Sequence, residues 1–368
     1  MEAPAICCLW IDEFAQTHVD CPDGERFRQT HQTFAVKRAQ RLGEQAVRRL
    51  ARLLPLPGAL GKLDQACRRE AYAGILRDAA LDLHAQHGVK DPHSGKRVSF
   101  GLIRMANIGP LFDVALALFR LGAPPGTHIH LCVYHSQFPL FLRSRIENQL
   151  DMALDRRREG AVFDLPDLRR RIDEVGAQDQ LFVVLGSPVT EVGRDHDYDW
   201  AVVEPSSMRS LIQLAGRVWR HRRDKVASQP NVLVCDSNLK HFEHPGQPAF
   251  CRPGFESLEF PLRPHSLAVL LAPWLDADRH MSIDARPRTV VRAESDRQPA
   301  SNLVDLEHAR MEAQMLPPVP AHRLNAASFW LRDHAWLTAF LQQAQPFRDQ
   351  PRPEVEVVWR LEENDEPQ

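Results

Sequence analysis

Residues 181–204, LFVVLGSPVTEVGRDHDYDWAVVE, hold two short apolar runs, at 181–186 and 200–204, on either side of a polar loop. Three more runs of the same kind lie at 98–105, 127–134 and 231–235. Amphipathic stretches at 109–121, 136–157 and 206–222 alternate with them. Strands that are apolar throughout are buried on both faces, and their alternation with helices is typical of a parallel sheet. The sequence therefore predicts an α/β fold with a doubly wound parallel sheet flanked by helices.

The rest of the chain departs from this alternation, which suggests three segments. Residues 1–95 are expected to form an N-terminal helical or connecting segment, with helices from about Glu25 to Leu54 and, after the break PLPG, to about His87. Residues 96–241 are expected to form the sheet domain. Scattered prolines and short apolar runs predict a smaller C-terminal accessory domain over 242–368, with structure expected at 266–274 and 327–345.

Composition excludes several classes of protein. The 368 residues carry 46 Lys and Arg against 48 Asp and Glu, so the overall charge gives no field that would attract nucleic acid. Residues 206–225 are a local exception, with six Lys or Arg and one Asp. The seven cysteines form no CxxC pair, which favours a reduced, cytoplasmic protein without a zinc site. No run of 18 apolar residues occurs, so we expect no membrane-spanning helix.

The stretch QLAGRVWRHRR, residues 213–223, places two arginines three residues apart. A helix over 206–222 would carry four residues on one stripe, at offsets 0, 3, 4 and 7: Gln213, Gly216, Arg217 and Arg220. Glycine removes a side chain where another group must approach closely, and guanidiniums on adjacent turns can contact phosphate oxygens. This favours a site that stabilises charge in phosphoryl transfer. The alternative is a surface helix with a solvated basic face, which explains the arginines but neither Gln213 nor Gly216.

The loop SPVTEVGRDHDYDW, residues 187–200, is the second candidate site. Gly193 and Asp195 are expected at the carboxyl end of the strand at 181–186, where open α/β sheets bind ligands. A glycine followed by a carboxylate suits a tight turn with contacts to a nucleotide ribose or a neighbouring arginine; the alternative is an acidic turn without a ligand. The pair His196-Asp197 is similar to that of metal phosphohydrolases. The sequence offers no recognisable motif for the remaining ligands, so we predict no metal site.

Four blocks occur in a fixed order: GLIRMANI (101–108), CVYHSQFPLFLRSRIE (132–147), SPVTEVGRDHDYDWAVVEPSSMRS (187–210) and QLAGRVWRHR (213–222). The pattern QxxGRxxR alone is shared by many helicases, whereas four blocks in this order and spacing are much more specific. Over residues 97–240 the chain resembles the second RecA-like motor domain of a superfamily 2 helicase. More narrowly, it resembles the C-terminal part of the helicase–nuclease of type I CRISPR systems, subtype I-F.

The resemblance implies a role for each motif. The residues that would face ATP across a cleft between two motor domains, with the arginines acting as fingers, are Gln213, Gly216, Arg217 and Arg220. The motif that couples nucleotide to DNA would contain Gly193 and Asp195. Thr190 and Glu191 of the same motif would lie nearer the DNA strand, with Thr190 in contact with the DNA. The residues that would contact the backbone of single-stranded DNA are His135, Ser136 and Arg143. For Arg143 and Arg145, a solvent-facing helix is an equally good interpretation.

A motor of this class also needs a GxxxxGK[ST] loop for phosphates and a DExx motif for Mg²⁺. Gly61-Lys62 and Gly95-Lys96 lack the following Ser or Thr. The run AICCLW ahead of Asp12-Glu13 has no phosphate loop before it, so we interpret that acidic pair as structural. The nuclease His-Asp motifs of the family do not occur. We therefore expect ATP to be shared with a first motor domain outside this chain, and Mg²⁺ to be bound only through that domain.

The leading hypothesis is that the chain is part of an ATP-dependent DNA helicase–nuclease of CRISPR antiviral defence and is inactive alone. Its partners would be single-stranded DNA, a CRISPR surveillance complex and a separately encoded first helicase half. The gene would then be split or truncated, and the sequence does not decide whether Met1 is a genuine start. The alternatives are a non-catalytic module that binds nucleic acid or a CRISPR complex, and the remnant of a truncated gene.

Overall fold

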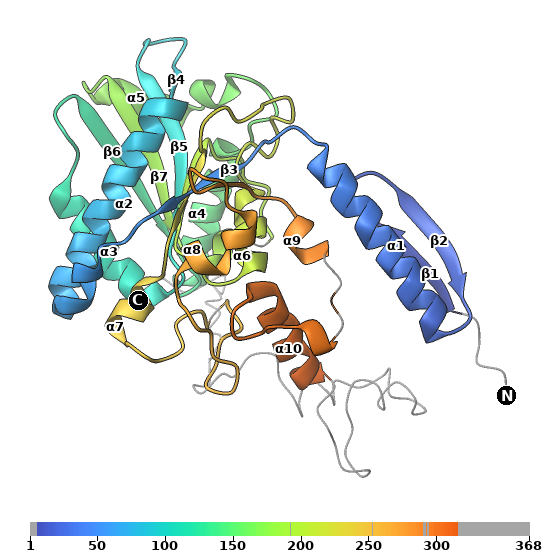
Figure 1. Ribbon diagram of the computed structural model, residues 1–368. Coiled ribbons are helices and arrows are strands. Elements are labelled where there is room, and N and C mark those ends of the chain that lie inside the picture. The colour runs from blue at the N-terminus through green and yellow to red at the C-terminus, as the bar shows by residue number, and fades with distance from the viewer. Residues whose placement is uncertain (1–5, 192, 252, 290–291, 293, 316–368) are drawn as a thin grey trace, which may run out of the picture. The chain divides into compact units, whose positions relative to one another are not determined.

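The computed structural model describes residues 6–191, 193–251, 253–289, 292 and 294–315. Within these residues an eight-stranded sheet has the order β10-β3-β9-β8-β5-β7-β6, and β4 pairs with β5 (Figure 1). The strands are β3 (Leu50–Leu54), β4 (Val89–Lys90), β5 (Arg97–Arg104), β6 (Thr127–Tyr134), β7 (Asp179–Gly186), β8 (Trp200–Val203), β9 (Val232–Cys235) and β10 (His280–Ser282). Every pair from β3 to β6 along this order is parallel, whereas β10 and β4 are antiparallel to their neighbours.

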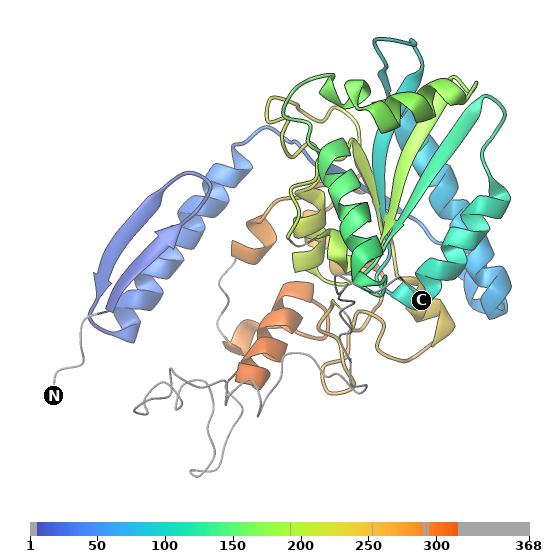
Figure 2. The same ribbon diagram turned by 180° about the vertical axis from the view of Figure 1, so that it is seen from behind.

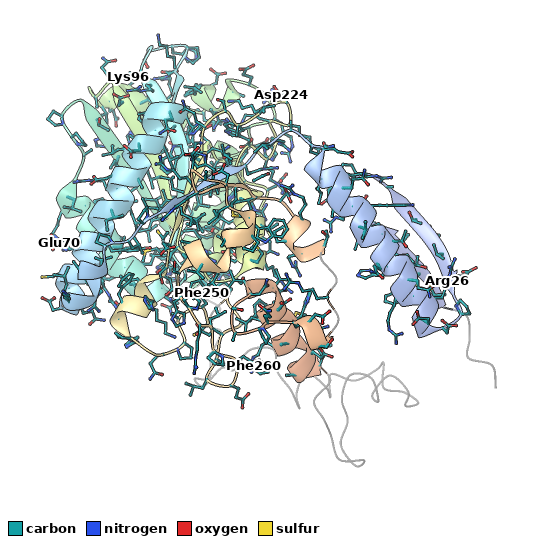
Figure 3. All side chains as sticks on the ribbon, viewed as in Figure 1. Arg26, Glu70, Lys96, Asp224, Phe250 and Phe260 are labelled. Carbon is teal, nitrogen blue, oxygen red and sulfur yellow. The ribbon has the colours of Figure 1, made fainter. Side chains whose placement is uncertain are left out.

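Helices cover both faces of the sheet. α2 (Gln65–His87) and α3 (Ile108–Leu121) lie on the face nearer the viewer in Figure 1. α4 (Leu140–Ala153), α5 (Pro166–Glu174) and α6 (Met208–Ala215) cover the opposite face, which Figure 2 turns forward. Successive strand residues alternate between two hydrophobic cores, one under each set of helices, and side chains fill both spaces (Figure 3). The predicted doubly wound parallel sheet is confirmed.

All five predicted strands occur, and their ends differ from the predicted ones by at most two residues. They could be read from the sequence because both faces of the central strands are buried, which makes the runs apolar throughout. Gly101 of β5 shows how closely the middle of the sheet is packed. A Cβ atom at this position would lie 2.1 Å from the ring of Trp200 on β8, so only glycine fits there.

Three predicted element boundaries are wrong. Residues 50–54, expected to end a helix, form β3, because Ala51 and Leu53 are buried where this strand pairs with β9 and β10. Sheet pairing in the interior outweighs local helix preference. α4 begins only after Pro139, and α6 ends at Ala215 rather than at residue 222. α5 and β10 were not predicted from the sequence.

Ahead of β3, β1 (Ile6–Ile11) and β2 (Gln16–Cys21) form an antiparallel hairpin that is followed by α1 (Gly24–Gly43). Asp12 closes the hairpin, since its Oδ1 accepts hydrogen bonds from the backbone N–H groups of Phe14 at 2.8 Å and Ala15 at 2.7 Å. Glu13 pairs with Arg38 of α1 at 2.6 Å. Asp12 and Glu13 thus both have structural partners, as the structural interpretation predicts. β3 and α2 lie within residues 1–95 yet belong to the sheet and its helical cover; the domain boundaries after residues 95 and 241 remain predictions.

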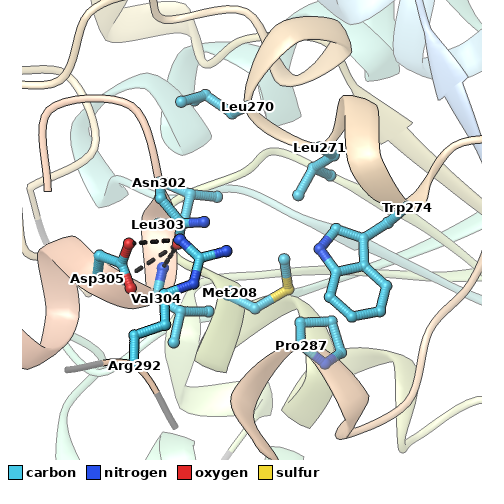
Figure 4. Close-up of a pocket in the computed structure, with 10 residues that line it drawn as sticks. All are labelled: Met208, Leu270, Leu271, Trp274, Pro287, Arg292, Asn302, Leu303, Val304 and Asp305. Atoms are coloured by element: carbon cyan, nitrogen blue, oxygen red, sulfur yellow. Dashed lines mark hydrogen bonds and ion pairs between the residues drawn. The ribbon is translucent and has the colours of Figure 1, made fainter. Parts of the chain in front are cut away.

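After β9 the described chain consists of loops and of α7 (Leu239–Glu243), α8 (Leu267–Leu270), α9 (Arg286–Thr289) and α10 (Leu303–Met315). Structure at 266–274 is confirmed by α8 and the 3₁₀ turn Ala272–Trp274, whereas 327–345 lies outside the described residues. A cavity of about 20 Å³ lies next to the ion pair between Arg292 and Asp305, whose nearest charged atoms are 2.8 Å apart. Figure 4 shows the residues that line this cavity, which has room for about one water molecule. Among the described helices, none is long and apolar enough to cross a membrane.

Candidate functional site

An open pocket of about 350 Å³ lies against α6 and the chain that follows it. Its lining consists of Glu191, Gly193, Ile212, Gln213, Gly216, Arg217 and Arg220. Five of these are residues that the sequence singled out as nucleotide-facing or nucleotide-coupling. The structure therefore brings the two candidate motifs, one after β7 and one after β8, to the same place on one face of the sheet.

The backbone reaches this arrangement by ending α6 early. Ser207 caps the start of the helix, because its hydroxyl accepts a hydrogen bond from the N–H of Ser210 at 3.1 Å. The helix ends at Ala215, and Val218 then forms a parallel bridge to Tyr198. The predicted stripe over 206–222 is therefore wrong for its second half. Gln213 lies on the last helical turn, whereas both arginines follow the helix in a turn held against the chain that leads into β8.

Arg217 is the most buried cation of the pocket, with 8% of its surface exposed. Its Nη2 donates to the backbone carbonyl of Glu191 at 2.7 Å. Its Nε and Nη1 are buried and have no hydrogen-bond partner among the described residues. Burial, and then the nearby charge of Arg220, lower the pKa of Arg217 from its ordinary value. Since buried donors are normally satisfied, this guanidinium is suited to an anion with several oxygen atoms.

Arg220 is exposed and is held by Asp195, whose Oδ1 accepts a hydrogen bond from its Nε. Arg157 contacts the other carboxylate oxygen, and His221 Nε2 lies 3.3 Å from it. The hydrogen bond from Arg220 is the main reason why the pKa of Asp195 falls to about 2. Of the contacts that the sequence suggested for Asp195, the described structure shows the one to a neighbouring arginine.

Gly193 and Asp195 do not lie at the strand end itself, where we predicted them. The carboxyl end of β7 is Gly186. Gly193, with φ of 75°, lies on the return segment, the described residues 187–191 and 193–199 that lead back to the amino end of β8. A left-handed φ favours glycine, which explains the residue type at this turn. The return segment runs beside α6, and this is how it reaches the pocket.

The Asp195–Arg220 pair predicts a specific pH dependence of stability. The pKa of Asp195 is lowered in the folded protein, so its contribution is fully present above the ordinary value of 3.8 and is lost as pH falls toward 2. Because the pair is about half exposed, we expect Asp195→Asn to cost less than about 1 kcal/mol at neutral pH. Urea unfolding should show this difference shrinking below pH 4. A difference that is constant from pH 6 to pH 3 would contradict the assignment.

Arg104 is a functional-site residue that sequence reasoning missed. It is fully buried at the end of β5 and donates to the Glu191 carboxylate, the Glu204 carbonyl and the hydroxyls of Ser206 and Ser210. Ser210 also donates to Glu191 at 2.6 Å. This network joins β5, the return segment and α6, so it fixes two walls of the pocket. An arginine within the apolar run 98–105 was the signal that could have revealed it.

A second cluster follows β6 and contains the predicted DNA-contacting residues. His135 stacks on Phe138 with ring centroids 4.1 Å apart, and Ser136 is exposed. Arg143 Nη1 lies 3.4 Å from the carbonyl oxygen of Ser136, to which it donates. The structure thus brings His135, Ser136 and Arg143 together. Thr190 does not join them: it is fully buried, and its hydroxyl donates to the carbonyl of Ser187 at 3.0 Å.

The His196-Asp197 pair has structural partners. His196 Nε2 lies 2.9 Å from Asp151, and Asp197 pairs with Arg222 at 2.6 Å. Neither side chain lines the pocket. In the part of the chain that the structure describes, no group of three or more His, Cys, Asp or Glu side chains is arranged to hold a metal ion.

A family model and two curated proteins match the chain. Residues 97–223 match the family model described as CRISPR-associated nuclease/helicase Cas3, C-terminal. The chain is 46% identical, over 94% of its length, to the CRISPR-associated nuclease/helicase Cas3 subtype I-F/YPEST of Pseudomonas aeruginosa, and 39% identical over 98% to that of Pectobacterium atrosepticum. It covers 31% and 33% of these two proteins, so it spans about a third of their length.

Solved structures of the same kind also match. A structure of T. fusca Cas3 with AMPPNP is 18% identical, with a TM-score of 0.44, over 73% of this chain and 26% of that one. The corresponding structure with ADP is 18% identical, with a TM-score of 0.43, over 72% and 26%.

Proposed function

The chain carries the C-terminal helicase region of a subtype I-F Cas3 protein, and from this premise we propose that its pocket binds the terminal phosphates of ATP. The observation that carries the proposal is the Arg217 guanidinium, which has two buried donor nitrogens without partners among the described residues and lines an open pocket beside Arg220. The polypeptide that binds the rest of the nucleotide and its Mg²⁺ would face this pocket.

The residues present fit a polyphosphate. Arg217 offers the donor nitrogens Nε and Nη1, which have no partner among the residues that the structure describes, and Arg220 lines the same pocket with a second positive charge. Gly216 contributes no side chain to the lining, so oxygens can approach the backbone closely. Gln213, exposed on the last turn of α6, is placed to orient a water molecule or a phosphate oxygen. When bound, ATP would supply the phosphoryl group, on whose oxygens charge is spread during transfer, and these cations would stabilise that charge.

The proposal is tested by measuring ATP hydrolysis with single-stranded DNA present. The 368-residue chain alone is expected to give essentially no turnover. The reason is that the arginines form only one side of the proposed site, whereas its phosphate loop and its carboxylates for Mg²⁺ would belong to a second polypeptide. Addition of a polypeptide that carries these motifs, such as a separately encoded first helicase half, should restore turnover. Appreciable hydrolysis by the purified chain alone would contradict this division of the site.

We further propose that His135, Ser136 and Arg143 contact the backbone of single-stranded DNA. A hydroxyl, a guanidinium and an imidazole at the end of β6 are suitable donors to phosphates, and the His135–Phe138 stack offers an aromatic surface to a base. Thr190 would act indirectly, by holding the turn after β7. In this role the chain would serve CRISPR defence in the cytoplasm, acting on invading DNA together with a surveillance complex.

The DNA contact predicts a change in salt dependence. Arg143→Ala should weaken binding of a single-stranded oligonucleotide and lower the slope of log affinity against log salt by about 0.7, the counterion release for one phosphate contact on a single strand. Arg170→Ala is the matched control, since Arg170 is exposed on α5 and belongs to neither cluster. Fluorescence anisotropy between 50 and 200 mM salt measures both slopes. Equal slopes for Arg143→Ala and the control would exclude the contact.

The second candidate is a binding module without catalysis. The same Arg143 cluster favours it, because a DNA contact of this kind needs no nucleotide. Two results together would select this function over the motor. The chain would bind DNA in a salt-dependent way, and no added phosphate-loop polypeptide would restore ATP turnover.

A further inference from the structure

In the turn that carries both pocket arginines, three consecutive backbone carbonyls, those of residues 217–219, accept hydrogen bonds. Arg217 O accepts from Tyr198 N at 2.9 Å, on the side of β8. On the other side, Val218 O accepts from Arg49 Nε at 2.9 Å, and Trp219 O accepts from Arg48 Nη2. Two consecutive arginines, about 170 residues earlier in the sequence, therefore hold the middle and the end of the turn.

These arginines project from a firmly anchored piece of chain. Arg48 and Arg49 directly precede β3, and Asn231 fixes them by donating to the carbonyl of Arg48 at 2.9 Å and accepting from the N–H of Leu50 at 3.0 Å. The carbonyl of Arg49 accepts from the N–H of Ile283 at 2.9 Å. The connector between α1 and β3 thus joins the edge of the sheet to the turn behind the pocket.

The contacts are costly in free energy, which is why they need an explanation. Arg49 is half-buried and donates to a carbonyl rather than to a carboxylate; burial, Arg48 and Arg220 lower its pKa to about 10, so it stays charged at neutral pH. Arg48 Nε is buried without a hydrogen-bond partner among the described residues. Trp219 adopts φ of 49°, a region that a bulky residue rarely occupies without support. Carbonyl contacts on both sides of the turn supply that support.

We propose that Arg48 and Arg49 are positioning residues that fix the turn after α6 and thereby aim Arg217 and Arg220 into the pocket. Neither needs to touch the bound phosphate. The consequence for ligand binding rests on the proposed function, whereas the consequence for the turn itself does not. The orientation of the arginine pair would then depend on the connector ahead of β3, which is distant from the pocket in sequence.

Hydrogen exchange on the full 368-residue chain tests the structural part. In Arg49→Met, amides of residues 217–222 should exchange about tenfold faster, because a charged hydrogen bond to the turn is lost. Peptides from β5 and β7 should be unchanged. Arg49→Lys keeps a charged donor and should recover a large part of the protection. Unchanged exchange at 217–222, or an equal rise in β5 and β7, would overturn the proposal, as would equal exchange in the Met and Lys variants.

Binding of inorganic triphosphate, measured by calorimetry, tests the functional part. Wild-type chain should bind, Arg217→Ala should not, and Arg49→Met should bind about tenfold more weakly, with recovery in Arg49→Lys. If wild-type chain and Arg49→Met bind equally, the positioning role is overturned. If wild-type chain does not bind triphosphate at all, the proposed function of the pocket is overturned instead, and the exchange experiment still decides whether Arg49 fixes the turn.

Discussion

Replacing Arg217 with alanine is expected to lower ATP turnover of the complete motor, this chain with a phosphate-loop polypeptide, by about 10³-fold. The reason is that Arg217 is buried, lines the pocket and has two donor nitrogens that find no partner in the described part of the chain, so its charge is available to transferring phosphate oxygens. The loss should fall mainly on kcat, because in the complete motor the phosphate-loop polypeptide supplies most of the ground-state binding of ATP, whereas the contact with Arg217 strengthens as charge spreads in the transition state. Steady-state kinetics with saturating single-stranded DNA gives both values.

Two variants separate this effect from a general disturbance. Arg223→Ala removes an exposed arginine from the same stretch of chain without touching the pocket lining, and it should leave turnover within about twofold of wild type. Arg217→Lys keeps the charge but loses the planar set of donors, and it should stay strongly impaired. A loss below about tenfold in Arg217→Ala, or an equal loss in Arg223→Ala, would contradict the role of Arg217.

Arg104→Met should destabilise the chain by about 3–5 kcal/mol, the largest expected effect on folding. The substitution keeps an apolar side chain of similar length but leaves the carboxylate of Glu191 buried without its cation. The hydroxyls of Ser206 and Ser210 and the carbonyl of Glu204 would lose a shared donor as well. Urea unfolding followed by far-UV circular dichroism measures the change.

The other end of the same strand offers a matched control. Arg97 pairs with Asp179 near solvent, so Arg97→Met should cost about 1 kcal/mol or less. The double variant Arg104→Met/Glu191→Leu should recover a large part of the lost stability, because it removes both charges together. An Arg104→Met chain as stable as Arg97→Met would show that Glu191 becomes hydrated in the variant, and the buried network would then not hold the pocket walls.

The sheet was predictable because burial leaves a direct record in the sequence. β5, β7, β8 and β9 are apolar over most of their length, and the observed ends agree with the predicted ones to within two residues. Arg217, Arg220 and Gln213 were predictable as a group because their residue types and spacing match a phosphate-binding need. These three residues line the same pocket as Gly193 because the return segment runs beside α6. No local sequence pattern predicts that path.

What the sequence could not supply depends on contacts between distant segments. Residues 50–54 read as the end of a helix, since their pairing with β9 and β10 involves residues more than 170 positions away. α6 ends at Ala215 because Val218 pairs with Tyr198 instead of continuing the helix. The same limit applies to Arg48 and Arg49, whose partners are carbonyls and therefore carry no residue-type signal. Thr190 is the opposite case, in which a residue type does suggest a role. Its position in the motif predicted a contact with DNA, but the side chain is buried.

The carboxylate of Asp195 gives the pocket an internal competitor. Asp195 pairs with Arg220, so any anion that binds this arginine must first displace the Asp195 carboxylate. Because that carboxylate belongs to the same chain, its effective concentration at Arg220 stays constant. A monoanion would gain too little binding free energy to displace Asp195, whereas a ligand with several charged oxygens could contact Arg217 at the same time. If the pocket binds phosphates as proposed, the Asp195–Arg220 pair would favour polyphosphates over simple anions.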